Sequence, residues 1–233
     1  MIDEERLKSL FPRVRTTPKA AATQIRIIEA YLHLMETTDY DKVMVSSIVE
    51  EASITRSTFY AYFTDIFDLL EYIEGEIVGH MPMPETGDLG SKPFGVNRPP
   101  DPSCCESPAW IREWFEFAEY FSSQLSILLG PTGNPQFEHK MRKAIREAHR
   151  RQMRNDGYTI DDGEEWLLKG LSDYHLRLTR EFVHECQRCY PGSNDVETLI
   201  QRIEYFLNNI RVGGWYMGYL SLMEEASDKS ERP

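Results

Sequence analysis

The sequence lacks any run of about 18 consecutive apolar residues, which is the length that a membrane-spanning helix needs. Its first residues, MIDEERLKSLF, carry too many charges for a secretory signal. We therefore expect a protein that does not associate with membranes and that works in the cytoplasm.

Recognisable enzyme motifs are also missing. There is no glycine-rich phosphate loop after a strand, no serine, histidine and aspartate set around a nucleophile elbow, and no His-Glu-x-x-His. Nothing in the sequence therefore predicts an enzyme, a cofactor or a bound metal.

Cysteine is scarce, with four residues in the chain. Cys104 and Cys105 are adjacent, while Cys186 and Cys189 form a Cys-x-x-Cys pair. Adjacent cysteines ligate one metal poorly, and thiols in the cytoplasm are usually reduced. Ordinary reduced thiols are the expected state, and a thiol-responsive or metal-responsive regulator remains an alternative.

Positive charge is in deficit, because 26 Lys and Arg face 38 Asp and Glu for a net charge of −12. Such a balance argues against a protein that coats nucleic acid without selectivity. Residues 12–63 are neutral, with six residues of each sign, and residues 12–28 hold four cations and no acid. Arg13, Arg15 and Lys19 precede the first helix that we expect, as a phosphate or minor-groove arm.

Period-2 alternation of apolar residues is absent, and helical periodicity runs through most of the chain, so we expect an all-α fold. The predicted helices are 18–36, 46–52, 56–62, 65–80, 108–129, 135–154, 163–189 and 195–224. Residues 81–107 contain six prolines, which block helix, and are expected to form a linker or loop. We expect a headpiece at 1–63, a connecting helix at 64–80, and a helical body at 108–233.

Two of the predicted helices, 46–52 and 56–62, are too short to be stable alone and must be braced by the longer helices beside them. In those longer helices, apolar residues recur at helical spacing and are expected to face inward. The first presents Ile25, Ile28, Leu32 and Met35, and the fourth presents Phe67, Leu70, Ile73 and Ile77. Two short helices between two long ones indicate a helix-turn-helix unit.

Residues 46–63 carry the pattern of a groove-reading element. Ala52 allows close approach of the next helix, Ile54 fills the turn, and Thr55 is placed to cap the helix that follows. Phe59 and Phe63, four residues apart, are expected to point inward. The outward face then consists of Arg56, Ser57, Thr58, Tyr60, Ala61 and Tyr62.

This outward face suits a DNA groove. Arginine binds guanine or phosphate, hydroxyls bind phosphates or base edges, and an apolar group contacts a thymine methyl. No acid occurs from residue 52 to residue 64. Composition alone is equally compatible with an amphipathic helix whose hydroxyl-rich face is merely solvated.

Residues 22–77, and above all Ala-Ser-Ile-Thr-Arg-Ser-Thr-Phe-Tyr-Ala-Tyr-Phe at 52–63, resemble the N-terminal domain of tetracycline-repressor (TetR/AcrR) family regulators. The resemblance implies a three-helix headpiece, a linking fourth helix, and an all-helical C-terminal domain that dimerises and often binds a small effector. It also implies DNA contacts by Thr58, Tyr60 and Tyr62, with Arg56 and Ser57 at the variable positions that usually touch bases.

The sequence departs from this family pattern at three positions. Ser53 stands where the turn glycine is usual, which raises the expectation of mild strain or a changed turn. Met44 replaces the usual hydroxyl cap of the second helix, so the cap either moves to Ser46 or is lost. Ile66 replaces a lysine that would hold a phosphate, with Asp65 and Asp68 close by, which predicts weaker DNA affinity.

The body is rich in apolar and aromatic residues at helical spacing. Trp110, Trp114, Phe117 and Phe121 are candidates to line a pocket for a flat apolar effector, although such stripes are more often plain core. By the same resemblance, residues 163–189 and 195–224 would pair with their twins in a homodimer. Gly214 and Gly218 would allow close approach at that seam, or merely mark a local break in the helix.

The sequence therefore predicts a dimeric, ligand-responsive regulator, most simply a repressor, that binds double-stranded DNA at a pseudo-palindromic operator. The predicted DNA contacts are Arg13, Arg15, Lys19, Ser46, Thr55, Arg56, Ser57, Thr58, Tyr60, Ala61 and Tyr62. The alternative is a co-regulator of the same fold that acts through a protein partner. The operator, the effector and the sign of regulation are not predicted.

Overall fold

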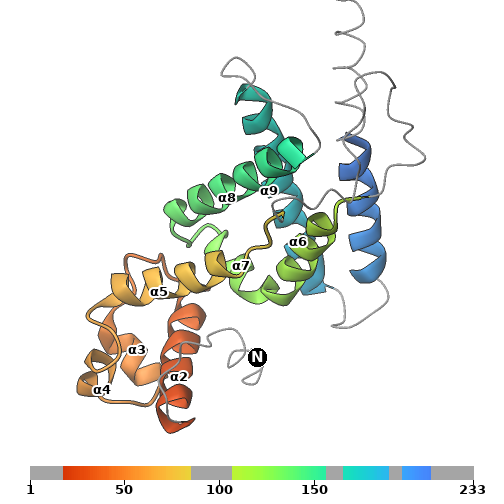
Figure 1. Cartoon of the computed structure of the whole chain (residues 1–233). Helices are drawn as coiled ribbons and strands as arrows, with labels where there is room; N and C mark the ends of the chain where they lie inside the picture. Colours follow the sequence, from red (N-terminus) through yellow and green to blue (C-terminus); the bar gives the residue numbers. More distant parts are fainter. Residues whose placement is uncertain (1–17, 85–106, 156–164, 189–195, 211–233) are drawn as a thin grey trace, which may run out of the picture.

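The computed structural model describes residues 18–84, 107–155, 165–188 and 196–210, and helix is the regular structure found in these ranges (Figure 1). The helices follow the predicted order closely. They are α2 (Pro18–Met35), α3 (Val45–Glu51), α4 (Arg56–Tyr60), α5 (Ile66–Gly79), α6 (Ala109–Tyr120), α7 (Ser122–Leu128), α8 (Pro135–Asn155), α9 (Glu165–Arg188) and an unlabelled helix at 196–210.

Helices α2, α3 and α4 form the headpiece at one end of the molecule, and α5 runs from it toward the body, which holds α6 to α9 and helix 196–210 (Figure 1). The predicted inward face of α2 is confirmed, because Ile25, Ile28, Leu32 and Met35 are fully buried. Burying such side chains contributes about 1.5–3 kcal/mol each, which holds α3 and α4 in place although both are too short to persist alone.

Helix α5 begins at a reciprocal cap. The Asp65 side chain accepts a hydrogen bond from the Asp68 backbone at 2.8 Å, and the Asp68 side chain accepts one from the Thr64 backbone at 2.7 Å. Carboxylates stabilise a helix N-terminus because they satisfy free N–H groups and complement the helix dipole.

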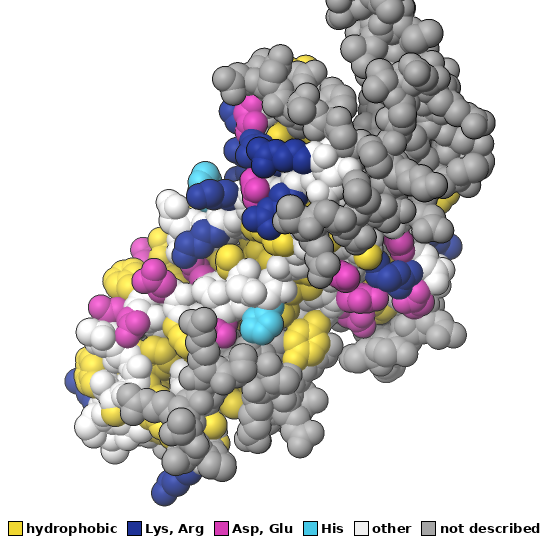
Figure 2. All heavy atoms as spheres, in the orientation of Figure 1, with side chains coloured by type: hydrophobic (Ala, Val, Ile, Leu, Met, Phe, Trp, Pro, Cys, Tyr) yellow, Lys and Arg dark blue, Asp and Glu magenta, His cyan; other side chains and the backbone are white. Residues whose placement is uncertain are grey.

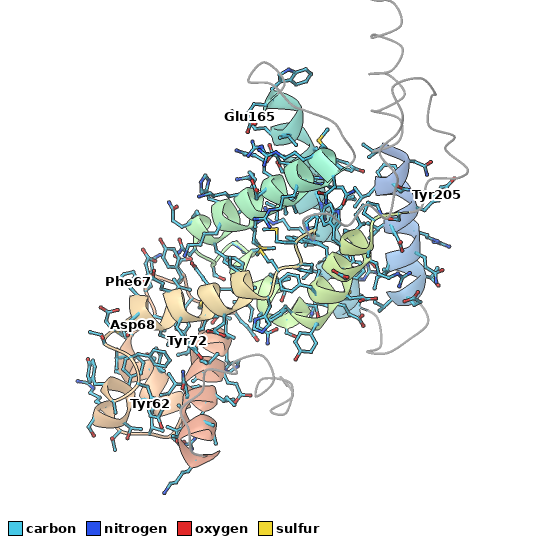
Figure 3. All side chains as sticks on the ribbon, viewed as in Figure 1. Tyr62, Phe67, Asp68, Tyr72, Glu165 and Tyr205 are labelled. Atoms are coloured by element: carbon cyan, nitrogen blue, oxygen red, sulfur yellow. The ribbon has the colours of Figure 1, made fainter. Side chains whose placement is uncertain are left out.

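The prediction that α5 buries Phe67 is wrong, because this side chain is 63% exposed. The buried stripe of α5 is formed by Leu69, Leu70, Ile73 and Ile77. Phe67 lies about 100° around the helix from the centre of that stripe, given 100° per residue. Figure 3 shows it at the outer side of the start of α5.

The prediction of one helix over 108–129 is also wrong in its extent, because the chain breaks there into α6 and α7 at Phe121. No proline or glycine marks the break. Phe121 takes φ −94° and ψ 15° and stays 1% exposed, packed on Phe117 with ring centroids 4.9 Å apart. Packing of this ring into the core accompanies the turn between the two helices.

The body is organised around α9, which packs against α6, α7 and α8. Helix 196–210 is tied to α6 by Arg112, whose guanidinium lies 3.1 Å from both Glu197 and Glu204. Within 196–210, the side chains of Phe206 and Ile210 are 46% and 38% exposed. The predicted continuation of this helix to residue 224, with Gly214 and Gly218, lies outside the described residues.

The connection between α7 and α8 joins the body to the headpiece. The Thr132 hydroxyl donates to the Met35 carbonyl at the end of α2 at 2.6 Å, and the Tyr40 backbone donates to the Thr132 carbonyl at 2.9 Å. Asn134, two residues further on, donates to the buried carboxylate of Glu74 in α5 at 2.9 Å. One short segment therefore touches both α2 and α5.

The predicted linker at 81–107 falls almost entirely outside the described residues. Among the helices that the structure does describe, none combines the length and apolar character needed to cross a membrane.

Candidate DNA-binding interface

Helix α3 starts without a side-chain cap. Met44 occupies the N-cap position, its side chain makes no capping hydrogen bond, and it is 61% exposed. Ser46 lies inside the first turn and is half-buried, so of the two predicted outcomes the cap is lost rather than moved to Ser46. Loss of a cap typically costs about 1 kcal/mol, and packing of Ile48 into the core offsets it.

The turn between α3 and α4 carries backbone strain at Ser53. This residue has φ 50°, in the left-handed region that glycine adopts freely. The Ile54 backbone N–H closes the turn by donating to the Val49 carbonyl at 2.9 Å. The turn geometry expected of a glycine is therefore kept, and the strain predicted from Ser53 is present.

Helix α4 begins at the predicted cap. Thr55 Oγ1 accepts a hydrogen bond from the Thr58 backbone at 3.1 Å. The same oxygen lies 2.8 Å from both Ser57 Oγ and Thr58 Oγ1. Three hydroxyls at the start of α4 are therefore linked through Thr55, which holds those of Ser57 and Thr58 in fixed positions.

The inward face of α4 is anchored as predicted, because Phe59 and Phe63 are 0% and 3% exposed, with ring centroids 6.0 Å apart. The helix itself ends at Tyr60, earlier than the predicted residue 62, so Ala61 and Tyr62 lie in the turn that follows. Of the predicted contact residues between 55 and 62, Thr58 and Tyr62 are half-buried. The exposed ones in this range are Thr55, Arg56, Ser57, Tyr60 and Ala61.

The start of α5 differs in charge from the start of α4. Asp65 and Asp68 cap it, Ile66 is half-buried, and Glu71 is exposed one turn further on. Figure 2 shows acidic side chains over the beginning of α5, whereas lysine and arginine side chains follow α8 in the body. A phosphate near the start of α5 would meet carboxylates, so this part of the surface is unsuited to a contact with the DNA backbone.

Lys19 is exposed in the first turn of α2, a helix with no acidic residue in that turn. Arg13 and Arg15 lie outside the described residues, so their place beside α2 stays a prediction.

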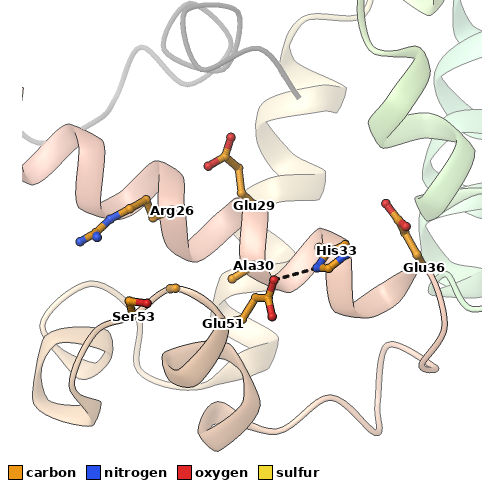
Figure 4. Close-up of a pocket in the computed structure, with 8 residues that line it drawn as sticks. Arg26, Glu29, Ala30, His33, Glu36, Glu51 and Ser53 are labelled. Atoms are coloured by element: carbon orange, nitrogen blue, oxygen red, sulfur yellow. Dashed lines mark hydrogen bonds and ion pairs between the residues drawn. The ribbon is translucent and has the colours of Figure 1, made fainter. Parts of the chain in front are cut away.

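A hollow of about 660 Å³ lies between α2 and α3 (Figure 4). His33 and Glu51 close one side, with Nδ1 and Oε1 2.9 Å apart. The lining residues are Arg26, Glu29, Ala30, His33, Glu36, Glu51, Ala52 and Ser53. Three carboxylates against one arginine make this side of the headpiece unsuited to phosphate.

The four predicted effector residues are all buried in the body: Trp110, Trp114, Phe117 and Phe121 are 3%, 0%, 7% and 1% exposed. Trp114 packs on Phe117 with ring centroids 5.7 Å apart, and Phe117 packs on Phe121. Trp110 instead contacts two histidines, His149 and His175, which the sequence interpretation did not select. Both histidines lie in the buried stripes of α8 and α9, and this position among apolar residues was the signal in the sequence that could have identified them.

Metal or thiol sensing gains no support in the described part of the chain. Cys186 is half-buried in α9, and Cys104, Cys105 and Cys189 lie outside the described residues. Within the described ranges, no group of three or more His, Cys, Asp and Glu side chains is placed to hold a metal ion.

Comparisons with known proteins agree with this geometry. The family model described as bacterial regulatory proteins, tetR family, matches residues 27–73, from within α2 to within α5. A solved structure of the dihydroxyacetone kinase operon activator DhaS is similar in fold, with a TM-score of 0.50 and 16% identity over 84% of this chain and 97% of that chain. No curated protein matches the sequence. Residues 27–73 are therefore similar to the N-terminal region of the tetR family of bacterial regulatory proteins, and the likeness to DhaS concerns the fold.

Proposed function

We propose that the protein is a cytoplasmic, dimeric and ligand-responsive transcriptional regulator, acting as a repressor at a pseudo-palindromic operator. The observation that carries the proposal is the outward face of α4. Arg56, Ser57 and Tyr60 are exposed there, while Phe59 on the opposite side is fully buried. An exposed arginine, hydroxyls and an aromatic edge on a rigidly anchored helix suit readout in the major groove.

Dimerisation is supported by large apolar side chains that a single copy leaves in water. Tyr174 on α9 and Tyr205, Phe206 and Ile210 on helix 196–210 are between 38% and 73% exposed. Tyr174 and Phe206 also touch, with ring centroids 5.9 Å apart, so the two helices share this surface. Pairing of such surfaces across a two-fold axis would place two copies of α4 about 34 Å apart, one turn of DNA.

A ligand response requires that the body and the headpiece move together. The Thr132 and Asn134 contacts to α2 and α5 supply a physical connection, since a shift of the α7–α8 segment acts on both helices. We propose a headpiece at 1–63, a connecting helix at 64–80, a linker at 81–107, and a dimerisation and effector domain at 108–233. An effector that favours one arrangement changes the spacing of the two α4 helices.

The test is selection of DNA fragments from random duplexes by the purified full chain at moderate salt. We expect an inverted repeat to enrich, and failure of any sequence to enrich would contradict the proposal. Arg56→Ala and Tyr60→Ala should each weaken binding to the selected site about tenfold, the scale of one lost base contact. Arg154→Ala, an exposed arginine on α8, is the matched control and should bind normally.

A second candidate is a co-regulator that acts through a protein partner, and one observation favours it. Met44 and Phe67, at the starts of α3 and α5, are 61% and 63% exposed, which places apolar side chains on the surface of the headpiece and of the connecting helix. If Met44→Ser and Phe67→Ser abolish regulation in cells while Arg56→Ala leaves it intact, the partner hypothesis replaces DNA binding.

A further inference from the structure

Two histidines meet inside the body. His149 on α8 and His175 on α9 are 7% and 0% exposed, and His149 Nε2 lies 3.0 Å from His175 Nδ1. One nitrogen of this pair must carry the hydrogen and the other must accept it. The hydrogen bond joins the two helices at the centre of the body.

Aromatic rings surround this pair. The Trp110 ring meets His149 edge-on with centroids 5.1 Å apart, and lies 5.7 Å from the His175 ring. Phe115 stacks on His175 at 5.5 Å, and Trp114 meets it edge-on at 5.1 Å. The two imidazoles are therefore packed among aromatic rings of α6. We call these five residues of α6, α8 and α9 the histidine cluster (Trp110, Trp114, Phe115, His149 and His175).

Two polar atoms of the histidine cluster, Trp110 Nε1 and His175 Nε2, are buried and have no hydrogen-bond partner among the described residues. The neighbouring Trp114 shows the contrast, because its Nε1 donates to Thr179 Oγ1 at 3.0 Å, and Thr179 in turn donates to the His175 carbonyl at 3.0 Å. Buried polar groups in proteins are almost always satisfied, and each exception calls for an explanation.

The histidine cluster is electrically neutral. Burial lowers the pKa of His149 to about 3 and lowers that of His175 well below its ordinary value, with the neighbouring His149 as a further cause. No carboxylate contributes to either shift. A charged molecule entering this environment would lose its hydration without gaining an opposite charge, so the site selects against ions.

We propose that the histidine cluster is the effector site and that its ligand is a small uncharged phenol, a flat aromatic ring with one hydroxyl group. The ring would pack among the aromatic side chains, and the hydroxyl oxygen would accept from Trp110 Nε1. The same hydroxyl serves either tautomer of the histidine pair, because it donates to His175 Nε2 when that atom is bare and accepts when it carries hydrogen. A ketone oxygen can only accept, so it pairs with His175 Nε2 only when that atom carries hydrogen.

The proposal rests on the proposed ligand response and connects to it. Trp110 Nε1 and His175 Nε2 are shielded from solvent, so a ligand reaches them only when the rings move apart. Thr179 of this region is followed by Arg180, whose guanidinium donates to the Leu129 carbonyl and lies 3.1 Å from Glu138. Leu129 precedes the segment that holds Thr132 and Asn134, so these contacts offer a route from the histidine cluster to the headpiece.

The test compares phenol with benzene, which has the same flat ring without the hydroxyl. Both are titrated into the ¹⁵N-labelled full chain while the indole N–H signals are followed, with Trp110→Phe identifying the Trp110 signal. We expect saturable movement of this signal with phenol and at least about tenfold weaker binding of benzene, the ratio that one ordinary hydrogen bond produces. Trp166→Phe is the matched control, since Trp166 is 67% exposed on α9 and should not affect binding.

Either of two other outcomes overturns the proposal. Equal binding of phenol and benzene would show that the unpartnered atoms play no part, and an unmoved Trp110 signal would place the effector elsewhere. Thermal shifts of the wild-type protein with the two compounds give a second measurement that needs no variant. If the chain enriches no DNA but the Trp110 signal responds selectively to phenol, the regulator proposal fails while the binding site stands.

Discussion

The carboxylate of Glu74 on α5 lies 2.7 Å from the ammonium nitrogen of Lys140 on α8, and the Glu74 side chain is only 1% exposed. Asn134 donates to the other carboxylate oxygen at 2.9 Å. A buried charge persists only when it is paired and hydrogen-bonded. The connecting helix is therefore held to the body at one point by a partnered charge, in addition to its apolar stripe.

The first prediction removes one partner of this charge. Lys140→Met leaves the buried Glu74 carboxylate with Asn134 as its partner. We expect the free energy of unfolding by urea to fall by about 2 kcal/mol. This is less than the 3–5 kcal/mol typical of a fully buried ion pair, because Lys140 is partly exposed. Lys143→Met, an exposed lysine on the same helix, is the control and should change stability by less than about 0.5 kcal/mol. Equal effects of the two variants would contradict this account.

The second prediction concerns the cap of α4. Thr55→Ala removes the oxygen that accepts from the Thr58 backbone and links the hydroxyls of Ser57 and Thr58. We expect a loss of about 1 kcal/mol in thermal unfolding together with weaker binding to the selected operator. Thr55→Ser retains the oxygen and should restore both properties. If Thr55→Ser behaves like Thr55→Ala, the methyl packing rather than the cap matters.

The third prediction relieves the strain at Ser53. Holding a residue with a side chain at φ 50° lowers the stability of the folded protein by about 1–2 kcal/mol. Glycine avoids this strain, but it loses more backbone entropy on folding, which costs about 0.5–1 kcal/mol. Ser53→Gly should therefore raise the stability by roughly 0.5–1 kcal/mol, seen as a higher melting temperature. Ser47→Gly, placed inside α3, has no such strain to relieve and should lower it. A lower melting temperature for Ser53→Gly would contradict the expectation.

Local patterns in the sequence were enough to predict the headpiece. The four-residue spacing of Phe59 and Phe63 gave the buried side of α4, and the position of Thr55 gave its cap, because both depend on contacts within one helical turn. The same periodicity predicted an all-helical fold. The helices of the described residues confirm this prediction, and the likeness to DhaS supports it.

Features that depend on distant partners could not be predicted in this way. His149 and His175 are 26 residues apart and meet because α8 packs on α9, and no local pattern links them. No proline or glycine stands at the break at Phe121, where the ring is buried against Phe117, so no local pattern indicates that α6 ends there. Phe67 was assigned to the core because it lies three residues before Leu70, although the buried stripe is centred elsewhere on α5.

The fourth prediction follows from the depressed pKa values of the histidine pair. In the folded protein both imidazoles stay neutral, with the pKa of His149 at about 3, whereas in the unfolded chain histidine takes a proton near its ordinary value of 6.5. Below pH 6.5 the unfolded chain therefore binds more protons than the folded protein. Stability from the pair is complete above pH 6.5 and is lost as the pH falls toward 3.

Urea unfolding between pH 7.5 and about pH 5 measures this loss, at up to about 1.4 kcal/mol per pH unit for each histidine below pH 6.5. Replacing both residues (His149→Gln with His175→Gln) removes the two groups, so stability should fall less steeply with acid than in the wild type. The difference between the two proteins cancels the contribution of carboxylates common to both. His184→Gln, on an exposed histidine of α9, should retain the wild-type slope, and a flattened slope in that variant would assign the pH dependence to surface histidines instead.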